Sequence, residues 1–191
     1  RGESVYSGHP LYLERMAVLL DKAEVQRLRT SVATHLCAIP SRTPADRLGR
    51  TLLALQADAT VDSDAVVAAA EEALRLGDHG LAERLARGAL NHGEHFGARL
   101  TLSSALAWQG RGREADSVLA AGGLGGLSEE QLMAWALPRA ANQFWMLSEP
   151  ERATTFLQNI RGRVREASSH STLDALSATF AMNAGNVRRA I

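Results

Sequence analysis

The chain has 191 residues, of which 46% are hydrophobic and only 5% aromatic, and its 21 basic side chains balance its 21 acidic ones. A formal net charge of zero argues against a nucleic-acid groove, because phosphate binding needs clustered basic charge. The single cysteine, Cys37, excludes an internal disulfide framework and makes a reducing cytoplasm the default location. No apolar run reaches the roughly 18 residues that a membrane span needs.

Alanine and leucine carry the apolar content, and both favour helices, whereas strand-rich chains use β-branched and aromatic residues. In the first sixty residues only Glu3–Ser7 suits a strand, and it is short. The prolines in Ile39–Pro44 predict a loop there. Apolar residues at helical spacing predict three amphipathic helices in this part of the chain, over Leu11–Leu20, Ala23–Leu36 and Asp46–Ala57.

From about Asp62 the sequence repeats itself. Four blocks each consist of a small residue suited to a turn, four mostly polar positions and an alanine. The turn residues are Gly77, Gly110, Ser148 and Gly185, and the alanines that follow them are Ala82, Ala115, Ala153 and Ala190. The alanines recur at steps of 33, 38 and 37 residues, a period typical of stacked αα-hairpins.

Helical periodicity surrounds these turns. Long apolar-periodic stretches precede them at Asp64–Leu76, Phe96–Gln109, Ser128–Leu147 and His170–Ala184, and shorter ones follow at Leu81–Leu90, Glu114–Ala120 and Glu151–Ile160. A turn glycine supplies a left-handed helix end, and a small alanine lets two antiparallel helices approach closely. Ser128 and Gln131 predict a capping box, and Pro138 predicts that its helix kinks or restarts near Leu137.

The residue pattern contains no recognisable catalytic, zinc-binding or dinucleotide-binding arrangement. His35 and Cys37 are two residues apart, so on a helix they point to different faces. The histidines between residues 79 and 95 lack the spacing of a zinc site. Gly110–Ala115 spells the dinucleotide-binding fingerprint, but it follows a helix rather than a strand. We therefore expect a chain that is not itself an enzyme, with no metal site and no cofactor.

Three tryptophans, Trp108, Trp135 and Trp145, fall within forty residues, and Phe144 and Met146 lie beside the last of them. A tryptophan at the rim of a groove offers a ring for packing and an N–H for hydrogen bonding. The same side chains equally suit the core between successive hairpins. The sequence leaves both locations open.

The turn glycine precedes a small residue by five positions at Gly77 and Ala82, and again in the next block. In this the region resembles tetratricopeptide motifs. It departs from them at the family's mid-helix glycine, replaced by Ala70, Ser103, Ala141 and Ala178, and at its tyrosine, replaced by Ala73, Leu106, Phe144 and Ala181. The resemblance implies an all-α fold, a tetratricopeptide-like αα-hairpin superhelix of about three and a half degenerate repeats over residues 61–191.

A second resemblance covers nearly the whole chain. It depends on short motifs in a fixed order: Ser7–Tyr12, Arg27–Arg29, Asp46–Leu48, Val61–Asp62 and Leu81–Leu90. This order is similar to the middle of large actinobacterial LuxR-type transcriptional regulators, which join a signal-transduction ATPase domain, a helical-repeat region and a terminal helix-turn-helix. The His9–Tyr12 box resembles the end of the winged-helix subdomain that follows the ATPase. Residues 1–60 are accordingly expected to be the helical end of that subdomain with connecting helices.

The resemblance implies a cytoplasmic regulatory module that senses an effector and relays its presence to ATPase and DNA-binding domains outside this chain. The effector, a small molecule or a protein or peptide, would occupy the concave groove. Neither nucleic-acid nor membrane contact is implied, and self-association is compatible with the module. The family's groove positions, carried over by register, are Glu71, Arg75, Ser104, Trp108, Trp135, Asn142, Trp145, Met146, Thr179 and Asn183, with Trp108, Asn142 and Trp145 foremost.

The alternative is a stand-alone tetratricopeptide-like adaptor for protein–protein contacts. A free-standing solenoid needs polar capping helices. The chain starts at Arg1 without a methionine and stops at Ile191 inside a helical pattern. We therefore expect a segment of a longer regulator rather than a complete adaptor.

Overall fold

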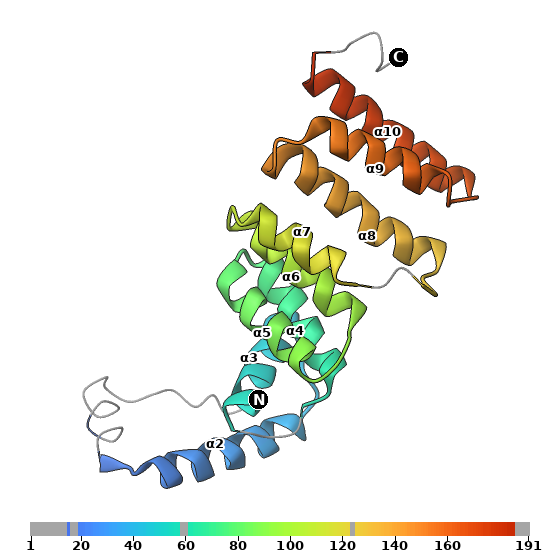
Figure 1. Cartoon of the computed structure of the whole chain (residues 1–191). Helices are drawn as coiled ribbons and strands as arrows, with labels where there is room; N and C mark the ends of the chain where they lie inside the picture. Colours follow the sequence, from blue (N-terminus) through green and yellow to red (C-terminus); the bar gives the residue numbers. More distant parts are fainter. Residues whose placement is uncertain (1–14, 16–18, 58–60, 123–124, 186–191) are drawn as a thin grey trace. The chain divides into compact units, whose positions relative to one another are not determined.

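In this computed structural model every regular element is helical among the residues that the structure describes, which are 15, 19–57, 61–122 and 125–185 (Figure 1). The predicted all-α class is therefore confirmed. The contacts divide the chain into two compact units, Arg1–Ala65 and Val66–Ile191. The strand expected at Glu3–Ser7 lies outside the described residues, as does most of the helix expected at Leu11–Leu20.

The first unit is built on helices α2 (Lys22–Cys37) and α3 (Pro44–Gln56), close to the bounds predicted from periodicity. The Asp21 carboxylate caps α2, and the Thr43 hydroxyl caps α3, whose first residue is a proline. The two helices pack through a small core of Ala33, Ala54 and Ala57. The assignment of this unit to a winged-helix-like subdomain remains an expectation from the resemblance.

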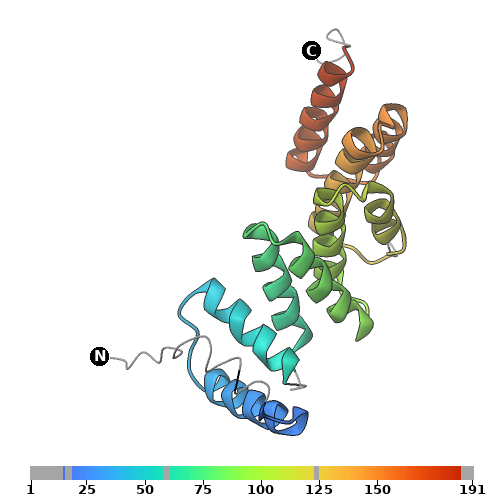
Figure 2. The ribbon, with the colours of Figure 1, turned by 90° about the vertical axis from the view of Figure 1, so that its left-hand side faces the viewer.

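Helix α4 (Ser63–Arg75) leads into the second unit. The elements that follow are α5 (His79–Asn91), α6 (Phe96–Trp108), α7 (Gly112–Ala120), α8 (Glu129–Ala141), a π-helical turn η1 (Asn142–Met146), α9 (Pro150–Arg161) and α10 (Ala167–Asn183). Neighbours along the chain pack against each other: α5 on α6, α6 on α7, α8 on α9 and α9 on α10 (Figure 1 and Figure 2). The helical stretches predicted over this region are all confirmed within a few residues.

The four aligned turn positions share a left-handed backbone. The φ angle is 81° at Gly77, 76° at Gly110, 56° at Ser148 and 77° at Gly185. At Gly110 the turn closes as a Schellman motif, in which Arg111 N–H donates to the Leu106 carbonyl and Gly110 N–H to the Ala107 carbonyl, both at 2.9 Å. The same pair of bonds closes the turn at Gly77. Glycine adopts this conformation without a Cβ clash.

The alanines five residues after these turns lie at points of closest packing. Ala82 and Ala153 are fully buried and Ala115 is nearly so, which confirms the expected close approach for these three blocks. Ala190, the fourth, lies outside the described residues.

The kink or restart predicted near Leu137 is wrong. Helix α8 runs through Pro138 to Ala141, and the irregularity begins at Asn142, where a π turn closes with Leu147 N–H donating to the Asn142 carbonyl at 3.0 Å. The predicted Ser128–Gln131 capping box is present at the start of α8. Buried residues lie on both sides of the proline, and their packing outweighs the single hydrogen bond that proline removes.

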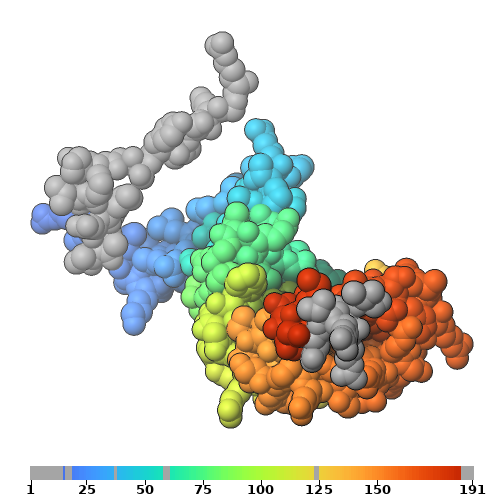
Figure 3. Space-filling view, turned by 90° about the horizontal axis from the view of Figure 1, so that it is seen from above, coloured from blue at the N-terminus to red at the C-terminus, as the bar shows by residue number. Residues whose placement is uncertain are grey.

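One hydrophobic core of the second unit surrounds α8. It joins Leu119 of α7, Trp135 of α8, Leu157 of α9 and Phe180 of α10. The Glu129 carboxylate, in the first turn of α8, accepts the backbone N–H groups of Arg165 and Glu166 at 3.0 and 2.9 Å, which ties α8 to the start of α10. Figure 3 shows α8 to α10, orange to red, packed together on the face seen there.

Replacing a turn glycine with alanine is expected to destabilise the second unit, whereas the same change inside a helix is expected to stabilise it. Gly110→Ala forces a left-handed alanine and should lower the free energy of unfolding by about 1 kcal/mol. Gly88→Ala, where a Cβ meets open space in α5, should raise it by about 0.5–1 kcal/mol. Urea denaturation followed by circular dichroism measures both free energies. If the two variants changed the free energy of unfolding in the same direction, the left-handed geometry of the turn would be contradicted.

Candidate ligand-binding site

An open pocket of about 190 Å³ lies among α6, α7, α8 and the π turn η1. Its lining is apolar apart from two serines and one asparagine, and no lining residue is ionisable. The residues are Ser103, Ser104, Ala107, Trp108, Ala115, Leu119, Pro138, Ala141, Asn142, Trp145 and Met146.

Small side chains on two facing helices create this hollow. Ser104 and Trp108 are one turn apart on α6, with Ala107 beside them. Ala141 lines the opposite wall at the end of α8, and Ala115 and Leu119 of α7 complete the lining. Because serine and alanine occupy the wall positions, helices that pack at ordinary distances still leave a cavity between them.

The π turn brings Asn142, Trp145 and Met146 to the pocket. Asn142 is buried, and its Nδ2 donates to the Gly112 carbonyl at 2.8 Å, which joins the turn to the start of α7. A Cβ at Gly112 would lie 2.7 Å from the Met146 Cβ, so glycine is needed for this close approach. The third wall of the pocket therefore depends on a backbone contact between η1 and α7.

The π turn also shifts the register by one residue. In the turn after α6, the carbonyl that closes the loop belongs to Leu106, four residues before Gly110. In the turn after η1, Glu149 N–H instead donates to the carbonyl of Gln143, five residues before Ser148. Gln143 is buried and Phe144 is only half-buried. The alignment of Phe144 with Leu106 is therefore wrong by one position, because η1 inserts one residue into the helix.

Two tryptophans stand at the pocket in different surroundings. Trp108 is 70% exposed and stacks on His79 of α5, with ring centroids 5.9 Å apart and planes at 7°. Trp145 is 44% exposed and meets Phe144 and Phe180 edge to face, at 5.4 and 5.2 Å. Met146, 50% exposed, adds a third large apolar side chain. Three large apolar side chains are therefore exposed around one pocket.

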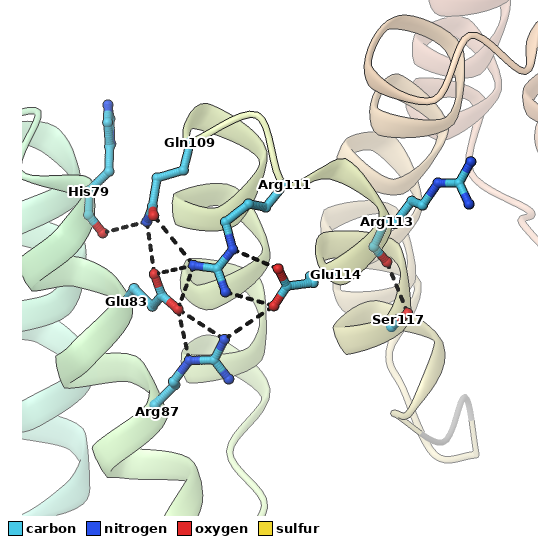
Figure 4. Close-up of polar contacts among 8 residues, drawn as sticks. All are labelled: His79, Glu83, Arg87, Gln109, Arg111, Arg113, Glu114 and Ser117. Atoms are coloured by element: carbon cyan, nitrogen blue, oxygen red, sulfur yellow. Dashed lines mark hydrogen bonds and ion pairs between the residues drawn. The ribbon is translucent and has the colours of Figure 1, made fainter.

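A charged network fixes the turn that follows Trp108. Figure 4 shows the Glu83 carboxylate facing the guanidinium groups of Arg111 and Arg87, with closest N–O distances of 2.7 and 2.9 Å. Gln109 Nε2 donates to Glu83 at 3.0 Å, and Arg111 also pairs with Glu114. Burial raises the pKa of Glu83, but hydrogen bonds from its cationic and amide partners outweigh it and hold that pKa below its usual range. These charges are paired with one another.

A second network lies on the other side of α7. The buried Asp116 carboxylate accepts from Arg139 Nε at 2.9 Å, from Arg152 Nη2 at 2.8 Å and from Gln143 Nε2 at 3.3 Å. The Arg139 guanidinium also lies 5.1 Å from the centre of the Trp135 ring. Burial raises the pKa of Asp116, but the two guanidinium groups and Gln143 outweigh it, so the pKa is lower than usual. This network joins α7, α8, η1 and α9.

The structure separates the ten predicted groove residues into three groups. Ser104, Trp108, Asn142, Trp145 and Met146 line the pocket. Glu71 and Arg75 lie exposed on α4, and Thr179 and Asn183 lie exposed on α10; none of these four lines it. Their assignment to a binding groove stays a prediction.

Trp135 corrects the expected set, because it belongs to the core rather than to the groove. It is 3% exposed, and its indole N–H donates to the Leu119 carbonyl at 2.9 Å. Of the two locations left open for the tryptophans, the core holds for Trp135 and the rim for Trp108 and Trp145. A buried indole N–H needs a partner, and the last turn of α7 supplies a free carbonyl.

Sequence reasoning missed six lining residues, among them Ala107, Pro138 and Ala141. The available signal was a run of small residues on the α6 face beside Trp108, since small side chains leave the volume that a tryptophan borders. Within the described part of the chain no cluster of histidine, cysteine or acidic residues is placed to hold a metal ion. None of the helices described is both long and apolar enough to cross a bilayer.

No family model, curated protein or solved structure matches this chain.

Removing an exposed tryptophan and a buried one is expected to affect stability very differently. Trp135→Ala removes a core side chain and its hydrogen bond and should cost about 3–5 kcal/mol of unfolding free energy. Trp108→Ala should cost less than about 1 kcal/mol, because the ring is largely in water. Chemical denaturation measures both values. A loss at Trp108 as large as that at Trp135 would show that its stacking on His79 is structural.

Stability is expected to fall in acid through Asp116. Because its pKa is depressed in the folded state, its contribution is present above the ordinary value of 3.8 and is lost as the pH falls below it. Asp116→Asn should lower the free energy of unfolding by about 1–3 kcal/mol at pH 7. The variant should also lose less stability than the unaltered chain between pH 5 and pH 2, roughly the interval over which such a carboxyl titrates. Asp174→Asn, at an exposed ion pair, is the control. Parallel curves for Asp116→Asn and the unaltered chain would contradict this role.

Proposed function

We propose that this chain is the regulatory, tetratricopeptide-like helical-repeat region of a LuxR-type transcriptional regulator, and that the pocket among α6, α7 and α8 receives its effector or protein partner. The observation that carries the binding role is the open apolar pocket flanked by Trp108 and Trp145. Aromatic residues form only 5% of the chain, yet two of its three tryptophans border this one hollow.

The repeat character of the proposal is supported by backbone geometry rather than by composition. The four aligned turn positions share a left-handed φ, and the alanines of three blocks are buried. Hairpins of this kind stack into solenoids whose side-by-side helices form extended binding surfaces. The regulator assignment is supported by the ordered motifs of the sequence.

The pocket is suited to coupling because it belongs to more than one hairpin. An occupant contacts α6 and α7 on one side and α8 with η1 on the other. The binding energy of the occupant therefore depends on the spacing between two successive hairpins. Binding shifts the population toward the spacing in which the occupant makes the most favourable contacts. A change in that spacing is a signal that neighbouring domains of a regulator can receive.

Both halves of the proposal are tested by tagging the gene at its chromosomal locus and purifying its product. We expect a polypeptide several times heavier than 20.5 kDa, with an ATPase domain and a helix-turn-helix outside this region. We also expect one or more partner proteins or small molecules to co-purify, and the double variant Trp108→Ala, Trp145→Ala to retain at most about a tenth of them, a loss of about 1.4 kcal/mol or more. Quantitative mass spectrometry measures both properties.

The control variant is Thr179→Ala, which changes an exposed α10 residue outside the pocket and should keep the co-purifying material. A product close to 20.5 kDa would overturn the regulator assignment and favour the stand-alone adaptor. Undiminished co-purification with the double variant would overturn the binding role of the pocket.

A further inference from the structure

The volume of the pocket limits its occupant to a compact group. Drug-sized ligands occupy clefts of roughly 300–1,000 Å³, whereas a cavity of about 150 Å³ accommodates benzene. At about 190 Å³ the pocket has room for one aromatic ring or one branched aliphatic group.

The chemistry of the lining limits the occupant further. None of the eleven lining residues carries an ionisable group. The nearby carboxylates are paired, since Glu83 is held by two arginines and Asp116 by two others. An ionised group entering the pocket would lose hydration without meeting a counter-charge on any lining residue. The occupant is therefore uncharged.

The unpaired donors at the pocket favour carbonyl oxygens on that occupant, and the buried Asn142 Oδ1, which accepts no hydrogen bond among the described residues, favours an N–H group on it. Among the residues described, the Trp108 and Trp145 indole N–H groups and the Ser104 hydroxyl make no hydrogen bond within the protein, whereas the Trp135 indole is satisfied. An indole N–H can only donate, so its natural partner is an acceptor oxygen. A hydrocarbon would leave these donors unused, and a peptide backbone offers an acceptor at every residue.

The exposed surface extends beyond what one ring can cover. Trp108 and Met146 are at least half exposed, and Trp145 nearly so. Large apolar side chains gathered around a small pocket are typical of a site where one anchoring side chain enters and the flanking chain covers the rest. A lone small molecule of the size of the pocket would leave most of this surface in water.

Given the binding role proposed above, on which this inference depends, we infer that the occupant is an uncharged segment of a protein chain. One large apolar side chain of that segment, aromatic or branched aliphatic, enters the pocket, and its backbone carbonyls accept hydrogen bonds from the indole N–H groups. A small neutral ring compound and a second copy of this chain are the competing occupants.

The test titrates the full chain with N-acetyl-phenylalaninamide and follows the three indole N–H signals by two-dimensional ¹H–¹⁵N NMR, which detects millimolar affinity. We expect the Trp108 and Trp145 signals to move and the buried Trp135 signal to stay, as an internal control. N-acetyl-glutamate amide, which carries a charge, should bind at least tenfold more weakly. Benzyl alcohol, which keeps the ring but lacks the amides, should also bind at least tenfold more weakly.

A variant with a filled pocket provides the specificity control. Ala107→Leu places a larger side chain on the pocket wall and should weaken binding of the phenylalanine amide at least tenfold. Ala120→Leu makes the same change at an exposed α7 position outside the pocket and should leave binding unaltered. If Ala107→Leu loses its helical circular dichroism, Ser104→Leu fills the same wall from a half-buried position.

Each other outcome overturns a defined part of the inference. Equal binding of benzyl alcohol would assign the pocket to small neutral ring compounds, and equal binding of the glutamate amide would refute an uncharged occupant. Movement of the Trp108 and Trp145 signals on raising the protein concentration alone would assign it to a second copy. If no probe binds while co-purification still depends on Trp108 and Trp145, the proposed function stands and the apolar anchor is refuted.

Discussion

The second unit depends on one local constraint, the left-handed residue that ends a helix together with the small residue that follows it five positions later. At Gly77 and Gly110 the left-handed backbone closes a Schellman motif, and the buried Ala82 and Ala115 let the next helix return at close range. Ser148 adopts the same backbone without being glycine. The close return of α7 against α6 is what brings Ala115 and Leu119 to the pocket, because larger residues there would hold the helices apart.

The pocket forms beside the π turn η1, where the chain departs from this pattern. Helix α8 keeps its path through Pro138 because residues before and after the proline are anchored in the core, and the extra residue is absorbed as a π turn immediately afterwards. That turn buries Asn142 against Gly112 and leaves Trp145 and Met146 half in water. Single π turns inserted in helices occur often at functional sites, since they redirect side chains without breaking the helix.

Two networks of paired charges lie beside the pocket. The Glu83 network holds the turn after α6 to α5, and the Asp116 network holds α7 to α8 and α9. Both sets of charges are largely satisfied by partners within the chain, so the apolar hollow between them presents no unpaired ion. A site of this composition gains affinity from burial of apolar area and from the unpaired indole donors, and it discriminates against charged groups by withholding a counter-charge.

The sequence by itself determined the helices, the turn positions and the small residues at the close contacts, because these follow from local backbone preferences and from periodicity. The resemblance to tetratricopeptide motifs also named Ser104, Trp108 and Asn142, and these three residues line the pocket. Only the tertiary structure decided that Trp135 lies in the core, since an indole N–H is buried only where another element offers it a carbonyl. The register around η1 was likewise decided by packing, because the π turn inserts one residue before the turn at Ser148 and no local residue preference signals it.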